Sequence, residues 1–380
     1  MISLIKTITN SISIITVAQL LLFAIFLLTT TRKKQPDKII LALFLFANSI
    51  YILDFLVYRY SNLIIPYSIS FFYIGDTFGF LFGPLLYLYT RAVTSKNYHF
   101  RIKHVVHFVP FILLFCFTLF YFQFQPYEIK LELLKTGLYG GTFSILYFVI
   151  MNFSILIYLS TAIVVIRKKN LNLKSYYSSL DKINFNWLKL VVSAFLIMWI
   201  VDIVNWITGI FEIRTLMFGE LLTLISLSIN FVFANLLILK SLRLPETEVV
   251  TETHKYEKSP LTVQNKHEIL QRLEKLMTHE KLFLHPSLTL GEIAQKLNVV
   301  PRYLSQVINE LKGQNFYDFV NTYRIEEAKR ILSDPSHNEE KILAVLFDCG
   351  FNSKSVFNTV FKKYTGITPS EYRRKYKKSA

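Results

Sequence analysis

The sequence predicts an all-α protein: a seven-helix transmembrane bundle followed by an all-helical domain with two helix-turn-helix motifs. Apolar and aromatic residues, including most of the 34 phenylalanines, gather in the first 240 of the 380 residues and raise the hydrophobic share to 52%. A polar stretch follows, and after it the same short pattern occurs twice. We therefore expect a membrane domain over residues 1–240, a linker over 241–261 and a soluble domain over 262–380.

Seven stretches of the N-terminal half are long and apolar enough to cross a bilayer, which takes roughly 20 apolar residues in a helix. They lie at about 11–30, 39–58, 69–93, 105–124, 142–166, 188–210 and 216–239. The first has one early lysine and no small-residue cleavage site, so we expect a span rather than a removed signal peptide. In the third, glycines and a proline at residues 78–84 predict a kink or a site of close helix packing.

The basic residues between these stretches predict the orientation of the bundle. Lys and Arg number four, four and five around the first, third and fifth connections, but one, two and one around the second, fourth and sixth. Because basic residues favour the cytoplasmic side, we expect the N-terminus outside and the C-terminal domain in the cytoplasm. The expected location is the inner (cytoplasmic) membrane of a bacterium, with multiple passes through the lipid bilayer.

Several polar residues fall in the outer half of the predicted spans. Four carboxylates at similar depth would repel one another, so one hypothesis is that a bound cation, an amine-bearing ligand or protonation neutralises them. The alternative is that each residue meets headgroup water or pairs between helices. The candidate ligand-sensing residues are Asp54, Asp76, Asp202, Asn205 and Glu220.

The repeated C-terminal pattern predicts two helix-turn-helix motifs, at residues 290–305 and 343–357. Each begins with a short helix whose apolar residues recur every three or four positions. Asn298 or Gly350 can then turn the chain through the left-handed region, and a second helix follows at once. This order of elements is that of a helix-turn-helix.

The second helix of each motif presents polar and basic side chains on the face that its apolar residues leave free. These residue types bond to base edges and to phosphates, so we expect them to contact DNA. From Gly350 onward the chain has eight Lys and Arg against one acid, Glu371, which also favours a polyanionic partner. The candidate DNA-binding residues are Arg302, Ser305, Gln306 and Asn309 in the first motif and Lys354, Ser355, Asn358, Thr359, Lys362 and Lys363 in the second.

Two further helices complete the predicted soluble domain. One, at about 263–281, has a single apolar stripe and is expected to begin the domain. A dimerising coiled coil is the alternative for this helix, which makes a homodimer a candidate assembly. The other, at about 315–332, carries core-facing residues along its length and is expected to be a rigid spacer.

The C-terminal pattern resembles the DNA-binding domain of AraC/XylS-type transcription regulators. Residues 350–357 and 361–373 are similar to that family's C-terminal signature, and residues 299–305 to its first reading motif. The resemblance covers about residues 262–376 and implies a seven-helix domain whose two recognition helices enter successive major-groove segments, about 34 Å apart. One departure is Leu346, a bulky residue where the family usually has a small one, which predicts a wider helix crossing. The family's base-reading positions fall here on Arg302, Ser305, Gln306, Lys354, Ser355, Asn358 and Thr359.

Residues 82–89 and 107–111 resemble, more loosely, the seven-span sensor regions attached to some bacterial regulators of this family. The two resemblances predict a membrane-bound one-component transcription regulator, in which an unknown signal ligand at the membrane domain controls binding to promoter DNA. A transporter or membrane enzyme with a fused regulatory DNA-binding module is the alternative, and a membrane half that only anchors the domain is a third. The sequence has no Gly-rich phosphate loop and no Gly-x-Ser-x-Gly or His-Glu-x-x-His motif, so we expect no enzyme activity, cofactor or metal.

Overall fold

The computed structural model of this chain contains two compact units. Unit 1 comprises Met1–Arg167 and Phe185–Glu248, and unit 2 comprises Lys168–Asn184 and Val249–Ala380. Within the described residues every element is helical apart from one isolated β-bridge, which confirms the predicted all-α fold. Most of the predicted linker, residues 244–261, lies outside the described residues. The structure describes residues 1–30, 35–95, 98–138, 141–180, 185–211, 215–243, 262–337 and 339–377.

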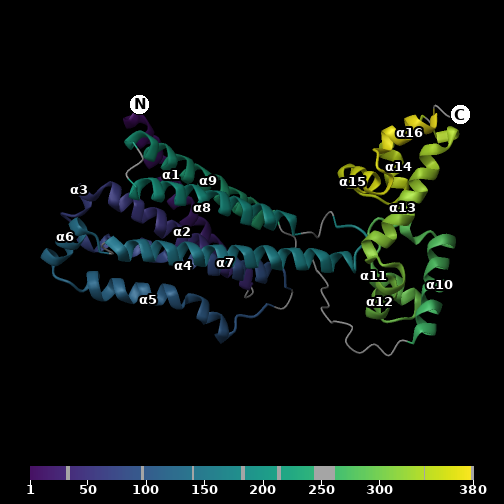
Figure 1. The fold of residues 1–380 in the computed structure, drawn as a ribbon, viewed down its shortest axis with the longest axis horizontal. Coiled ribbons are helices and arrows are strands. Elements are labelled where there is room, and N and C mark those ends of the chain that lie inside the picture. The colour runs from purple at the N-terminus through teal and green to yellow at the C-terminus, as the bar shows by residue number, and fades with distance from the viewer. Residues whose placement is uncertain are drawn as a thin grey trace. The chain divides into compact units, whose positions relative to one another are not determined.

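Unit 1 is a bundle of long helices that run alongside one another (Figure 1). Among the described residues, seven helical segments are long and apolar enough to cross a membrane. They coincide with the predicted stretches, except that the first begins at Ile2 and the fifth continues to Lys174. The elements that begin in unit 1 are α1 (Ile2–Thr30), α2 (Pro36–Arg59), α3 (Ser61–Ile64), η1 (Ile69–Phe71), α4 (Ile74–Val93), η2 (Ile102–Phe108), α5 (Val109–Thr118), η3 (Leu119–Gln123), α6 (Tyr127–Thr136), α7 (Gly141–Lys174), α8 (Asn186–Ile210) and α9 (Leu216–Arg243).

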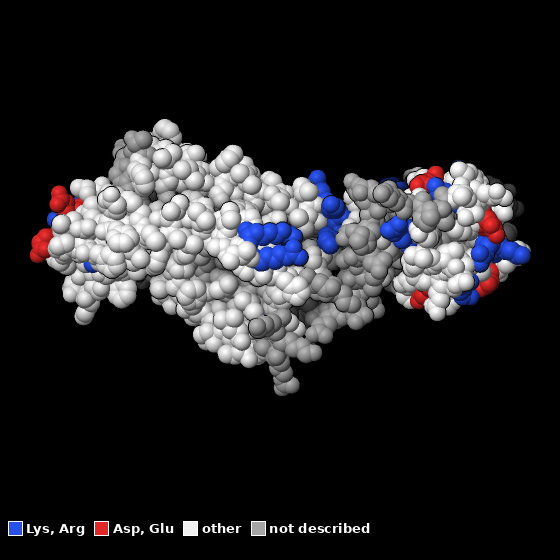
Figure 2. Space-filling model, turned by 90° about the horizontal axis from the view of Figure 1, so that it is seen from below, with Lys and Arg blue, Asp and Glu red and all other residues white. Residues whose placement is uncertain are grey.

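The surface of unit 1 agrees with this composition. On the face shown in Figure 2, its surface is largely free of charged side chains, whereas unit 2 carries both basic and acidic ones. Many apolar side chains point outward, for example Leu22 and Ile25 of α1, which are 69% and 57% exposed. A surface of this kind suits hydrocarbon rather than water.

Helix α4 packs closely against its neighbours at its glycines. A Cβ atom at Gly83 would lie 2.9 Å from the Tyr158 ring of α7, and one at Gly75 would overlap Asp54 of α2. The Gly75 N–H also donates to the Asp54 carboxylate at 3.2 Å. Within residues 78–84, where the sequence predicts a kink or close packing, a Cβ atom at Gly79 would also lie 2.7 Å from Met151 of α7, and α4 continues through Pro84 as one helix.

Unit 2 contains two hydrophobic cores joined by one helix, α13. Its Phe319 and Val320 belong to the first core, and its Ile325 and Ala328 to the second, as expected of a rigid spacer. The bulky Leu346 is fully buried in the second core. The elements that begin in unit 2 are α10 (Val263–His279), η4 (Leu282–Leu284), α11 (Leu290–Leu297), α12 (Pro301–Lys312), α13 (Phe316–Ser333), η5 (Pro335–His337), α14 (Ile342–Asp348), α15 (Lys354–Thr365) and α16 (Pro369–Lys377).

The turns of both helix-turn-helix motifs have the predicted left-handed conformation. Asn298 has φ 53° and Gly350 has φ 81°. Helix α11 begins with a capping box of Thr289 and Glu292, and the Ser353 side chain caps α15. These caps satisfy backbone N–H groups that a helix leaves unpaired at its start, so α11 and the recognition helix α15 begin at defined residues.

Candidate functional site

The second helix-turn-helix motif presents its polar residues on the surface. Lys354, Ser355, Thr359 and Lys362 are exposed along α15, and Asn358 is half-buried on the same helix. Phe357 and Phe361 are fully buried on its other side. Helix α15 therefore offers an amide, hydroxyls and ammonium groups at the base-reading positions that the sequence predicts.

Lys363, also predicted to bind DNA, is held by an ion pair. Its Nζ lies 2.8 Å from the Asp318 Oδ1 on α13, and this hydrogen bond raises the pKa of Lys363. The Tyr364 hydroxyl donates to the Asp318 backbone oxygen at 3.2 Å. Lys363 therefore helps to fasten α15 to α13.

The first motif is less open than the sequence predicts. Ser305 is 3% exposed and Gln306 is 4% exposed, so the expectation that both face a groove freely is wrong for this structure. The Gln306 Nε2 donates to Glu310 at 2.8 Å, and Glu310 pairs with Lys266 of α10 at 2.8 Å. Asn309 donates to the Ser305 backbone oxygen, also at 2.8 Å. These polar side chains bond to one another across α10 and α12, so they do not all point into solvent.

Three arginines of the domain differ in exposure and in their contacts, and therefore in how readily they can reach DNA. Arg302, at the start of α12, is half-buried, and its guanidinium lies 5.6 Å from the Tyr303 ring. Arg373 donates to the Glu340 backbone oxygen and therefore holds α16 in place. Arg374 is exposed on α16 and can meet a phosphate.

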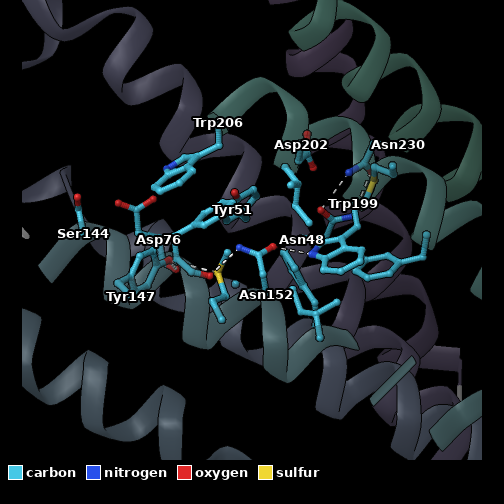
Figure 3. A pocket seen from close by; sticks show the side chains of 18 residues that line it. Asn48, Tyr51, Asp76, Ser144, Tyr147, Asn152, Trp199, Asp202, Trp206 and Asn230 are labelled. Carbon is cyan, nitrogen blue, oxygen red and sulfur yellow. Dashed lines mark hydrogen bonds between the residues drawn. The ribbon is translucent and has the colours of Figure 1, made fainter. Parts of the chain in front are cut away.

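Unit 1 contains a cavity of about 260 Å³ that is lined by residues of α2, α4, α7, α8 and α9 (Figure 3). Two carboxylates, Asp76 and Asp202, line it together with the aromatic rings of Tyr51, Trp199 and Trp206. Phe148 adds a further ring and stacks on Trp206, with ring centroids 3.4 Å apart. The cavity wall is therefore acidic and aromatic.

The neutral polar groups of this cavity are already hydrogen-bonded to one another. The Asn48 and Asn230 amides exchange two hydrogen bonds of 3.1 and 3.2 Å. The Trp199 Nε1 donates to Asn152 at 2.7 Å, and Asn152 donates to the Phe148 backbone oxygen. These asparagine and tryptophan side chains therefore offer a ligand few hydrogen-bonding groups that are not already used.

A second cavity of about 590 Å³ has Asp76 and Asp202 in common with the first. Asp54 and Asn205 also line it, so the structure brings together four of the five candidate ligand-sensing residues. The Asp202 carboxylate accepts a hydrogen bond from Ser226.

Glu220, the fifth candidate, has a counter-charge. Arg59 Nη1 donates to Glu220 Oε1 at 2.6 Å and Arg59 Nη2 to Oε2, so the pair is bidentate. The hypothesis that all four carboxylates lack a counter-charge is therefore wrong for Glu220. The two residues are 161 positions apart, and no local pattern in the sequence indicates their pairing.

Comparison with known proteins identifies the C-terminal domain. Residues 293–375 match the family described as a helix-turn-helix domain. An uncharacterized HTH-type transcriptional regulator of Staphylococcus aureus (strain COL) is 30% identical over 135 residues, which cover 34% of this chain and 18% of that protein. The HTH-type transcriptional regulator YijO of Escherichia coli (strain K12) is 34% identical over 90 residues, 24% of this chain and 31% of that protein.

A solved structure is also similar in sequence. The C-terminal domain of AraT, a response regulator from Geobacillus stearothermophilus, is 32% identical, with a TM-score of 0.26, and the match covers 31% of this chain and 88% of that one. The C-terminal region of this chain is thus an AraC-type helix-turn-helix domain, as the sequence predicts. The chain spans only 18% and 31% of the lengths of the S. aureus and E. coli relatives.

Proposed function

We propose that this protein is a membrane-bound one-component transcription regulator, in which a signal at unit 1 controls sequence-specific binding of unit 2 to promoter DNA. One observation carries this proposal: a single chain joins seven apolar helices of membrane-spanning length to an AraC-type helix-turn-helix domain. The exposed polar face of α15 supports base reading, and the exposed Arg374 of α16 supports contact with phosphates.

The cavities of unit 1 support a sensing role. Charged residues inside membrane spans are costly and tend to serve a function. Asp76 and Asp202 line space that no side chain of the described residues fills. A ligand bound there would favour the helix arrangement that it fits best and so shift the population of states.

We further propose that the N-terminus lies outside and the DNA-binding domain in the cytoplasm. The excess of basic residues around the odd-numbered connections supports this orientation. Seven spans put the fifth connection on the same side as the C-terminal domain, and the compact unit that Lys168–Asn184 forms with this domain is consistent with that number of spans.

A reporter experiment tests this orientation. An enzyme active only outside the cytoplasm should be silent when fused after residue 170 or 260 and active after residue 62 or 213. A second enzyme, active only in the cytoplasm and fused at the same positions, is the control and should give the opposite pattern. Activity of the first enzyme after residue 260 would place the helix-turn-helix domain away from DNA and contradict the proposed function.

A further inference from the structure

The cavity of about 260 Å³ in unit 1 has the chemistry of a site for an organic cation. The Asp76 carboxylate has no hydrogen-bond or ion-pair partner within the part of the chain that the structure describes, although it lines the cavity. An ionised carboxylate at this depth is costly without a counter-charge. A positively charged ligand is therefore more favourable here than a neutral one.

The other groups of the cavity favour an organic ammonium ion over a neutral polar molecule. Tyr51, Trp199 and Trp206 present aromatic rings, and the faces of such rings attract cations. The asparagines are occupied with one another and with Trp199, so a neutral ligand would have to break existing hydrogen bonds. The volume lies just below the roughly 300–1,000 Å³ of pockets for drug-sized molecules, which favours a small ligand.

We propose that this cavity binds a small ammonium compound with an apolar or aromatic body, its charge at Asp76 and its body against the rings. The further claim that this cavity receives the regulatory signal rests on the proposed function. Binding of the cation to the cavity does not require DNA, so cation binding and DNA binding can be tested separately. Asp76 comes from α4, Tyr51 from α2, and Asp202, Trp199 and Trp206 from α8, so a ligand that contacts all of them bridges three spans (Figure 3).

Tryptophan fluorescence gives a direct test. Two of the three tryptophans, Trp199 and Trp206, line the cavity, so binding should change their emission. Purified full-length protein in nanodiscs is titrated with 2-phenylethylammonium and benzyltrimethylammonium, and with 2-phenylethanol as the neutral counterpart. We expect a saturable change with the two cations and none with the alcohol.

Matched variants locate the binding. The double substitution Asp76→Asn/Asp202→Asn should weaken binding of both cations at least about ten-fold, because a hydrogen bond to a charged group contributes roughly 1.5–3 kcal/mol. Asp37 lies in the first turn of α2 and does not line the cavity, so Asp37→Asn should leave cation binding unchanged. Unchanged size-exclusion behaviour and thermal unfolding of the full-length protein would show that the double variant is folded.

Three results would overturn the proposal. They are equal binding of the alcohol and the cations, unchanged binding to the double variant, and no saturable response to either cation. A change in fluorescence on acidification alone, without a response to either cation, would show that protonation, and not a ligand, neutralises the carboxylates of the cavity. Each of these leaves the DNA-binding role of unit 2 intact, whereas failure of operator binding would leave the cavity result intact.

A second inference comes from the connection between α7 and α8. Residues 175–178, which we call the docking segment, pair with the chain just before α11 as a short antiparallel bridge between Tyr177 and Thr289. The Ser178 N–H donates to the Leu288 oxygen at 3.1 Å, and the Leu290 N–H donates to the Tyr176 oxygen at 2.9 Å. Tyr176 also packs against the first core.

Arg324 of α13 anchors the docking segment. Its side chain is 1% exposed, and two of its nitrogens donate to the Ser178 backbone and hydroxyl oxygens, both at 3.2 Å. The same guanidinium donates to the oxygens of Phe283 at 2.7 Å and His285 at 2.8 Å. Undocking of this segment would take the Ser178 backbone oxygen away from the buried Arg324 Nη1, and a buried donor left without a partner costs more than the bond itself contributes.

We propose that docking of residues 175–178 is the intramolecular contact through which unit 1 controls the DNA-binding domain. Helix α7 lines the cavity with Phe148 and Asn152 and ends at Lys174, directly before the docking segment. A shift of α7 therefore acts on Arg324 and on the start of α11, which support the two helix-turn-helix motifs. This proposal stands on the bridge and on Arg324, and it does not depend on the ligand.

Locked and released forms of the full chain test the proposal. Tyr177 and Thr289 form a non-hydrogen-bonded pair, whose Cα atoms lie about 4.5 Å apart, within disulfide range. Tyr177→Cys/Thr289→Cys should therefore cross-link on oxidation, and the cross-link should hold the two fragments together after cleavage at a protease site inserted between residues 244 and 261. The single-cysteine variants control for the native Cys116 and Cys349.

The released form is Ser178→Ala, which loses the hydroxyl bonds to Leu288 and Arg324, with Ser175→Ala as the matched control. We expect operator affinity to differ at least about five-fold between the cross-linked and the Ser178→Ala proteins, the lower end of typical allosteric coupling. Ser175→Ala should behave as wild type. Absence of the cross-link in a protein that binds its operator, or equal affinities of locked and released forms, would overturn the proposal.

Discussion

The substitution Gly350→Ala should lower the free energy of unfolding of the DNA-binding domain by about 2 to 5 kcal/mol and abolish operator binding. Gly350 has φ 81°, and an added Cβ atom would lie 2.7 Å from the backbone oxygens of Phe283 and Leu284. A side chain in the left-handed region costs roughly 1–2 kcal/mol, and overpacking against a fixed backbone costs about 1–3 kcal/mol more. A domain with a typical stability of about 5–15 kcal/mol loses much of it.

Two other glycines provide the control for this prediction. Gly313 and Gly366 also have positive φ values, 64° and 80°, but a Cβ atom there would meet nothing within 4 Å. Alanine at either position should cost only the backbone strain. Amide hydrogen exchange of the full-length protein should show a large loss of protection in α14 and α15 for Gly350→Ala and a small one for the controls. Equal losses in all three variants would contradict the packing described for the second motif.

The substitution Asn358→Ala should change which DNA sequences are bound, whereas Arg374→Ala should weaken binding to all sequences alike. Asn358 lies on α15 at a position that the family resemblance assigns to base reading, and loss of an amide contact to a base costs about 1–3 kcal/mol at particular base pairs. Arg374 is exposed on α16, where its charge suits a phosphate. Loss of a phosphate contact reduces the salt dependence of binding without altering sequence preference.

Selection from random DNA measures both effects. The full-length protein in nanodiscs is used to enrich its preferred sequence, and single-base variants of that sequence are then compared for each protein. We expect Asn358→Ala to lose discrimination at one or two base pairs and Arg374→Ala to keep the wild-type preferences. Uniform weakening by both substitutions would contradict the assignment of α15 as a base-reading helix.

Most helices could be predicted from the sequence because their signals are local. Thr289 and Glu292 form a capping box three residues apart, and Asn298 ends α11 in the left-handed conformation. The end of α7 is different, because its predicted span stops near residue 166, where lysines and asparagines begin, whereas the helix continues to Lys174. Hydropathy shows where a chain leaves the membrane, and polar helix formers carry the helix further.

The site was harder to predict because its contacts join distant residues. An amphipathic pattern assigns Gln306 to the surface, but Lys266 and Glu310 draw its amide into a polar contact between α10 and α12. The docking segment has no apolar periodicity, and Arg324 reaches Ser178 across 146 residues. Only a folded chain shows which buried donors and acceptors find each other over such separations.

Mapping the DNA occupied by the full-length protein in living cells tests the central claim most directly. The chain is expressed with an epitope tag, cross-linked, recovered from the membrane fraction and sequenced with its bound DNA, beside an Asn358→Ala variant of equal abundance. We predict discrete promoter sites with two reading segments about one helical turn apart, and altered or lost occupancy in the variant. Recovery of no discrete sites from the membrane-bound protein, or identical sites with both proteins, would contradict a membrane-bound regulator that reads DNA through α15.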